Sequence, residues 1–154
     1  MSKRGRADER WEDLADLVLI IAREIQFRGY SDERAVRLSA SEGMVMRHLK
    51  HEPAAPPSHI AAATGLQRTN LSTVLRGLER KGLIERRSAS DDRRGVTVHA
   101  TPLGVANNTL VRKEWGKEVS AAAAHDSDGL DAALLLLAKV KSGLIESRPT
   151  ESRT

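Results

Sequence analysis

The chain has 154 residues, with 25 Lys and Arg against 21 Asp and Glu, and carries a formal net charge of +4. This length suits one domain, or one small domain with a helical extension. Because there is no cysteine, the sequence excludes a disulfide framework, cysteine-ligated zinc, an iron–sulfur cluster and a thiol redox switch. Hydrophobic residues make up 40% of the chain and charged residues 30%, which argues against wholesale disorder.

The N-terminal part of the chain predicts neither a membrane span nor a secretory signal. Its longest apolar stretch, residues 14–22, contains Asp16 and is far shorter than the roughly 20 residues that cross a bilayer. Acidic residues follow the basic residues of positions 3–6 before any apolar core begins, so no signal peptide is expected. We therefore expect a cytoplasmic protein without membrane contact.

A first helix is predicted over about residues 7–28, because apolar residues recur there at three-and-four spacing. They are Trp11, Leu14, Val18, Ile21 and Ile25. A second helix is predicted to begin after Ser39, since Glu42 stands three residues on and the two form a capping box. This helix lasts until Pro53.

Two short helices follow, and together they predict a helix-turn-helix. After a stiff connection over residues 53–57, Pro57 suits the first turn of a third helix that stops at Gly65. A fourth helix then runs to about Lys81. One of its faces is apolar, formed by Leu71, Val74, Leu75 and Leu78. The other faces are mostly polar, as in a helix that enters a DNA groove.

A β-hairpin is predicted directly after the fourth helix. Residues 83–88 and 96–100 have the pattern of strands, and residues 89–95 form a polar loop between them. A hairpin in this place is a wing. Thr101 and Pro102 then begin a long fifth helix, with Thr as the cap and Pro in the first turn.

A sixth helix over about residues 130–145 is apolar nearly all round. Because helices one, five and six cannot all bury wide apolar surfaces in so small a monomer, we expect a homodimer in which they interlock. The predicted fold class is mainly α (α+β), a winged helix-turn-helix with N- and C-terminal dimerisation helices. The expected regions are an N-terminal dimerisation helix (7–37), the DNA-binding domain (38–100), the C-terminal dimerisation helices (101–146) and a disordered tail (147–154).

The positive charge is concentrated where DNA would bind. Residues 67–95 contain eight basic and four acidic residues, so these 29 residues account for the whole net charge of +4. The candidate base contacts lie at the start of the fourth helix: Gln67, Arg68, Thr69, Asn70 and Thr73. Gln and Asn can bond adenine, and Arg can bond guanine. Arg76 lies further along, where a side chain meets phosphates. A plain solvated helix face is the alternative.

The predicted wing tip supplies the second set of candidates, Asp92, Arg93 and Arg94. A guanidinium on a thin hairpin can enter the narrow and negative minor groove. Asp92 fits this role if it braces a neighbouring arginine through a bidentate pair. The alternative is an ordinary charged hairpin loop. The wing segment contains no aromatic residue that could stack on single-stranded bases, so duplex DNA is the expected partner.

The run from residue 38 to residue 104 resembles the MarR family of bacterial transcriptional regulators. The resemblance is carried by the segments 66–73, 78–86, 92–96 and 101–104 at matching spacing. It implies a homodimer that binds a palindromic operator, usually as a repressor, and that a small aromatic or phenolic ligand releases. By this resemblance, Asp92 and Arg94 are the wing residues, with Arg94 reading the minor groove, and Gln67, Thr69, Asn70 and Thr73 are recognition-helix contacts.

Three positions depart from the family's usual pattern. Gly77 stands inside the recognition helix, where it costs about 1 kcal/mol of helix propensity. Ala100 replaces a larger apolar residue, so the packing under the wing is expected to be thinner. Arg76 stands where an acidic residue is frequent, which favours phosphate binding. These departures affect the operator sequence rather than DNA binding itself.

Other candidate sites are less specific. Ile21, Ile25, Met44 and His48 could line a ligand pocket, with core packing as the alternative. His48, His51 and Glu52 have a spacing that could hold a metal, but without cysteine we expect no metal and no cofactor.

Three function classes stay open. They are a ligand-responsive repressor, a DNA-binding regulator without an effector, and a winged-helix module for protein contacts. No catalytic motif is present in the sequence, so we expect no enzyme.

Overall fold

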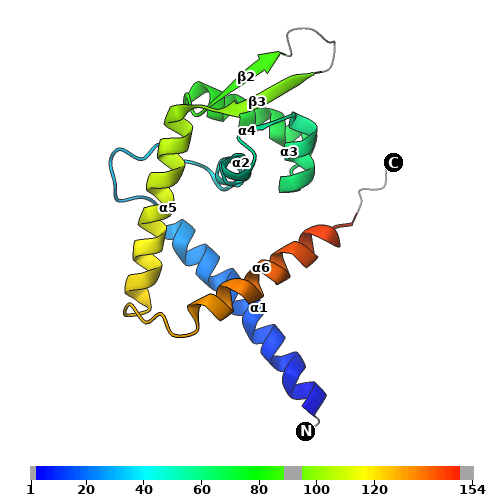
Figure 1. Ribbon diagram of the computed structural model, residues 1–154, viewed down its shortest axis with the longest axis vertical. Coiled ribbons are helices and arrows are strands. Elements are labelled where there is room, and N and C mark those ends of the chain that lie inside the picture. The colour runs from blue at the N-terminus through cyan, green and yellow to red at the C-terminus, as the bar shows by residue number, and fades with distance from the viewer. Residues whose placement is uncertain (1–2, 89–94, 150–154) are drawn as a thin grey trace. The chain divides into compact units, whose positions relative to one another are not determined.

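The computed structural model describes residues 3–88 and 95–149. It contains two compact units, Met1–Val119 and Ser120–Thr154. The described elements are α1 (Lys3–Arg28), α2 (Ala40–His51), β1 (Ala54–Ala55), α3 (Pro57–Thr64), α4 (Arg68–Arg80), β2 (Ile84–Ser88), β3 (Val96–Ala100), α5 (Pro102–Ala122) and α6 (Leu130–Glu146) (Figure 1). The predicted fold class, mainly helical with a winged helix-turn-helix, is confirmed.

The hydrophobic core of the first unit lies among α2, α3, α4 and the three strands. Leu71, Leu75 and Leu78 bury the inner face of α4, as the spacing predicts, and Val74 packs at the edge of the core. Val45, Met46 and Leu49 of α2 face them, and Ile60, Leu83, Ile84 and Val98 complete the cluster. Ala100 is also packed against it, as a partly buried residue.

The wing is part of a three-stranded antiparallel sheet with the order β1-β3-β2. β2 and β3 pair from Ile84 opposite Ala100 to Ser88 opposite Val96. The prediction that residues 53–57 form only a connection is wrong in one respect: Ala54 and Ala55 form β1, opposite His99 and Val98. So short a strand between prolines has no periodicity of its own, and it exists because β3 offers it a free edge.

The caps that position the winged segment were predicted correctly. Ser39 N donates to Glu42 Oε2 at 2.7 Å, and Glu42 N donates to Ser39 Oγ at 3.2 Å, which completes the capping box. Gly104 N donates to Thr101 Oγ1 at 3.0 Å. A Cβ at Gly104 would lie 2.0 Å from the Leu83 carbonyl oxygen, so only glycine lets α5 begin so close to the strand. The first helix begins at Lys3, four residues before the predicted start, because its polar first turn carries no periodic signal.

Wide apolar surfaces remain exposed on α1 and α6 within the single chain. On α1, Leu19 is 69% exposed and Phe27 is 85% exposed. α6 contains no buried residue, and its exposed large apolar residues are Leu130, Leu134, Leu135, Leu136, Leu137, Leu144 and Ile145. In the described part of the chain, no helix has both the length and the apolarity to span a bilayer. Residues 150–154 of the predicted tail lie outside the described residues.

Candidate DNA-binding surface and adjoining cavity

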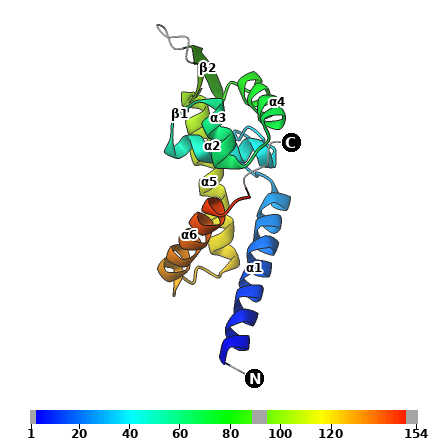
Figure 2. The ribbon, with the colours of Figure 1, turned by 90° about the vertical axis from the view of Figure 1, so that its right-hand side faces the viewer.

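Figure 2 shows α4 at the edge of the winged body. Its leucines Leu71, Leu75 and Leu78 are buried. All the residues at or near the start of α4 and further along it that were proposed above for DNA contact are exposed. They are Gln67, Arg68, Thr69, Asn70, Thr73 and Arg76. The amphipathic spacing therefore brings these side chains together on the surface of one helix.

The first turn of α4 has an electrostatic preference for anions. Gln67 is its N-cap, makes no side-chain capping bond, and is followed by no acidic residue in the first turn. The first N–H groups of a helix have no partner within the helix, and the helix dipole adds positive potential there. A phosphate near this end would accept hydrogen bonds from these N–H groups and would be attracted by the positive potential.

The arginines around α4 differ in their ionic partners. Arg86 pairs with Glu79 at 3.4 Å, and Arg87 pairs with Glu85. Arg68, Arg76 and Arg80 form no ion pair with any carboxylate in residues 3–88 and 95–149, and Arg76 Nη2 lies 3.4 Å from Thr73 Oγ1. Among the described residues of this segment, the arginines without an ion pair thus lie on α4. Asp92, Arg93 and Arg94 lie outside the described residues, so the expected bracing of an arginine by Asp92 stays a prediction.

The structure explains why a glycine stands at position 77, which the sequence alone did not. An ideal Cβ at Gly77 would lie 2.8 Å from Glu42 Oε1, so a side chain here would force the Glu42 carboxylate to shift. Glu42 is only 7% exposed, and its Oε2 accepts a hydrogen bond from Lys81 Nζ at 2.6 Å. Gly77 therefore makes room for a buried carboxylate that joins α2 to α4.

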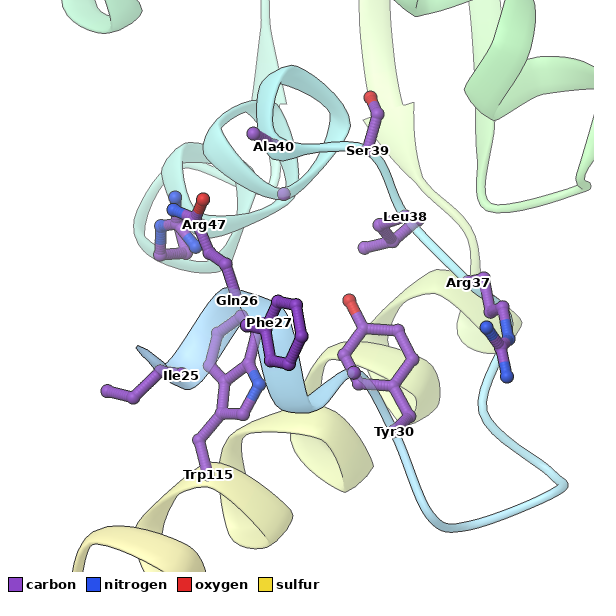
Figure 3. A pocket seen from close by; sticks show the side chains of 12 residues that line it. Ile25, Gln26, Phe27, Tyr30, Arg37, Leu38, Ser39, Ala40, Arg47 and Trp115 are labelled. Atoms are coloured by element: carbon purple, nitrogen blue, oxygen red, sulfur yellow. The ribbon is translucent and has the colours of Figure 1, made fainter. Parts of the chain in front are cut away.

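A cavity of about 410 Å³ adjoins this junction (Figure 3). It is lined by Ile25, Gln26, Phe27, Gly29, Tyr30, Arg37, Leu38, Ser39, Ala40, Gly43, Arg47 and Trp115. Of the four residues proposed from the sequence, Ile25 lines it. Ile21, Met44 and His48 do not: Ile21 is exposed on α1, and Met44 and His48 are half-buried on α2.

The cavity combines aromatic rings with hydrogen-bond donors. Trp115 Nε1 is buried and has no hydrogen-bond partner among the residues that the structure describes. The Tyr30 and Trp115 ring centroids are 6.1 Å apart. The Arg47 guanidinium carbon lies 5.9 Å from the Trp115 ring centroid. Burial lowers the pKa of Arg47, and burial raises the pKa of Tyr30 above its usual value.

Sequence reasoning missed Phe27, Tyr30, Arg47 and Trp115. The available signal was that all four aromatic residues of the types Phe, Tyr and Trp lie outside the winged segment. Three of them gather at this cavity from α1, the following connection and α5. Their proximity depends on the tertiary structure, which cannot be predicted from the spacing of residues along one helix.

α5 holds the connection between α1 and α2, which forms one wall of the cavity. Asn107 is buried, accepts a hydrogen bond from Val36 N at 2.8 Å and donates one to Val36 O at 3.2 Å. Glu114 Oε1 accepts from Ser31 Oγ and from the N–H groups of Ser31 and Asp32, at 2.7 and 2.9 Å for the N–H groups. These bonds from Ser31, above all from its hydroxyl, lower the pKa of Glu114.

Glu52 lies close to His48 and His59, and the candidate spacing of His48, His51 and Glu52 does not form a triad. Glu52 Oε2 lies 3.4 Å from His48 Nε2 and 3.4 Å from His59 Nδ1, and His51 stays exposed. Within the described ranges, no group of three His, Asp or Glu residues is arranged to hold a metal ion.

Comparison with known proteins finds a similarity to one family. Residues 38–96 match the model of the MarR family. This match covers less than half of the chain, so it shows that the winged helix-turn-helix segment is similar to the MarR family. The match covers α2, β1, α3, α4 and β2. These elements include α4, with its exposed polar surface, and the elements that pack around it.

Solved structures of low sequence identity share the fold of this chain. The transcriptional regulator BldR from Sulfolobus solfataricus is 22% identical, with a TM-score of 0.69 over 92% of this chain and 99% of that chain. NadR in complex with 4-hydroxyphenylacetate is 20% identical, with a TM-score of 0.56 over 96% of this chain and 95% of that chain. BpsR from Bordetella bronchiseptica, whose DNA binding is regulated by 6-hydroxynicotinic acid, is 19% identical, with a TM-score of 0.60 over 84% and 98%. No curated protein matches the chain by sequence.

Proposed function

We propose that this chain is a transcription regulator of the MarR family that binds double-stranded DNA by sequence and acts as a repressor. The observation that carries the proposal is α4, which turns polar and cationic side chains outward from a buried leucine face. A helix of this kind presents its first residues to base edges in the major groove. MarR-family regulators are generally not enzymes, and no catalytic activity is proposed.

The proposed contacts divide by their chemistry. Gln67 and Asn70 would bond adenine and Arg68 guanine, with Thr69 and Thr73 beside them. Arg76 would contact phosphate, since it lies farther along the helix and forms no ion pair within the described residues. In the wing, Asp92 would brace an arginine, and Arg93 and Arg94 would reach the minor groove.

The proposed operator is palindromic, because the proposed binding unit is a homodimer. The many exposed large apolar residues of α1 and α6 support this assembly, since monomeric proteins rarely leave large contiguous apolar patches in water. A two-fold symmetric dimer places two copies of α4 on two half-sites of the same sequence.

The proposed effector is a small aromatic acid that binds the cavity beside α2. Aromatic side chains would hold its ring, Arg47 would pair with its carboxylate, and Trp115 Nε1 would donate a hydrogen bond. The ligands of NadR and BpsR, 4-hydroxyphenylacetate and 6-hydroxynicotinic acid, are of this chemical class. Binding would reduce the affinity for DNA.

Selection from a library of random duplexes tests the DNA-binding function. We expect the full-length protein to enrich one palindromic sequence, and failure to enrich any sequence contradicts the proposal. For the cavity, a thermal-shift assay uses 4-hydroxyphenylacetate and 6-hydroxynicotinic acid as probes. We expect at least one probe to raise the melting temperature of the wild type but not of Arg47→Leu. Absence of any shift favours a regulator without an effector.

A further inference from the structure

Lys81, at the C-terminal end of α4, is tied to the chain segment that borders the cavity. Its Nζ donates a hydrogen bond to the carbonyl oxygen of Arg37 at 2.8 Å and pairs with Glu42 Oε2 at 2.6 Å. Arg37 and Ser39 line the cavity, and Figure 3 shows them in succession with Leu38 along one of its borders. One lysine therefore contacts both the cavity border and the carboxylate behind it.

Glu42 makes this junction compact. Its Oε2 accepts from Lys81 Nζ and from the backbone N–H of Ser39, at 2.6 and 2.7 Å, while its Oε1 fills the space above Gly77. Since the carboxylate is buried, loss of one partner would leave a charge without compensation. The junction should therefore form or break as a unit rather than stretch gradually.

We propose that Lys81 is a positioning residue through which the occupancy of the cavity is transmitted to α4. A group that fills the cavity displaces the segment carrying Arg37 and Ser39. Lys81 then either loses its acceptors or moves with them, and in both cases the C-terminal end of α4 changes its position. This inference rests on the proposed function, because it gives the route from the effector site to the DNA-binding helix.

A built-in occupant tests the route without knowledge of the natural ligand. Ala40 lines the cavity, so Ala40→Phe places a phenyl group at its border. The four full-length proteins are the wild type, A40F, Lys81→Met and the double variant. Hydrogen exchange of the amides of α4 is measured in each. We expect A40F to increase exchange about fivefold or more when Lys81 is present and to have no further effect in the Lys81→Met background.

Two variants control for simple loss of stability. Lys81→Arg retains a donor for both acceptors and should keep the response to A40F. Lys50→Met removes an exposed lysine elsewhere in the same unit and should also keep it. If Lys81→Met does not fold, Glu42→Gln replaces it in the cycle. The glutamine retains an amide oxygen that can accept the hydrogen bond from the N-cap residue. An effect of A40F that is equal with and without Lys81, or absent in both, overturns the inference.

The affinity for the selected duplex supplies a second readout of the same cycle. A40F should weaken DNA binding when Lys81 is present and should not weaken it in the Lys81→Met background. If the wild type selects no duplex, the proposed function fails. The exchange measurement needs no DNA and still decides whether Lys81 connects the cavity with α4.

Discussion

The carboxylate of Glu42 occupies the space that a side chain at Gly77 would need, with Oε1 2.8 Å from the ideal Cβ position. A glycine within a recognition helix is costly by propensity, at about 1 kcal/mol relative to alanine. Its presence is explained by α2, which delivers a buried, hydrogen-bonded acid to that point of α4. The angle between α2 and α4 is therefore set by a close contact as well as by the leucine core.

Gly77→Ala should lower stability in the wild type although it raises helix propensity. The new Cβ must push Glu42 Oε1 aside, which strains the hydrogen bonds that Oε2 accepts from Lys81 and Ser39. We expect a net loss of about 1 kcal/mol in the free energy of unfolding. In the Glu42→Ala background, Gly77→Ala should raise the free energy of unfolding by about 0.5–1 kcal/mol, because the Glu42 carboxylate no longer opposes the new Cβ and alanine favours the helix. Urea unfolding of the four proteins measures this cycle. The same sign in both backgrounds would refute the steric explanation.

The stability should also depend on pH through Glu42. Burial raises the pKa of its carboxyl, but hydrogen bonds from Lys81 and Ser39 lower it by more, so the net pKa lies below the ordinary value of 4.5. A group whose pKa is lower in the folded state stabilises fully above its unfolded pKa and loses this contribution as the pH falls through the folded value. The melting temperature should therefore fall when the pH drops below about 4.5.

The Glu42→Gln variant separates the contribution of Glu42 to the pH dependence of stability from the contributions of other acidic residues. Hydrogen bonds also lower the pKa values of Glu114 and Asp32, so the wild type has several acid-sensitive groups. The Glu42→Gln variant should be less stable at neutral pH and should lose less of its melting temperature on acidification. Parallel profiles for the two proteins would show that the Glu42 carboxylate contributes nothing specific.

Local signals predicted much of this fold, and nonlocal contacts account for what was missed. The Ser39–Glu42 capping box and the Thr101 cap involve residues within one turn, so they can be recognised in the sequence. β1 escaped prediction because Ala54 and Ala55 become a strand only against β3. The cavity residues could not be foreseen for the same reason, since Tyr30 and Trp115 are brought together by the packing of α5 on the connection after α1.

Self-association should depend on the apolar surface of α6. Leu135 is 62% exposed in the single chain, and Leu135→Glu places a charge in the proposed dimer interface. We expect the dimer to weaken by about tenfold or more, measured by sedimentation over a range of concentrations. Lys139→Glu is the matched control, because it adds a carboxylate to an already polar position of α6. A wild type that sediments as a single chain would contradict the proposed assembly.

The wing should contribute to affinity through Arg94. If Arg94 enters the minor groove, Arg94→Ala should weaken operator binding by about 1–3 kcal/mol and leave the dimer intact. Arg112→Ala, an exposed arginine of α5, serves as the control. Fluorescence anisotropy with the selected duplex gives both affinities. Equal binding by Arg94→Ala and the wild type would remove the wing from the mechanism.

Sequence-specific binding of duplex DNA is the central claim, and a salt titration of binding tests it most directly. The affinity of the wild type is measured for the selected duplex and for a scrambled duplex of the same composition, at about 50 and 200 mM salt. We predict a preference for the selected duplex at both concentrations. We also predict a loss of about a thousandfold in affinity between them, because each phosphate contact releases counterions. Equal affinity for the two duplexes, or an affinity that does not change with salt, would contradict the account.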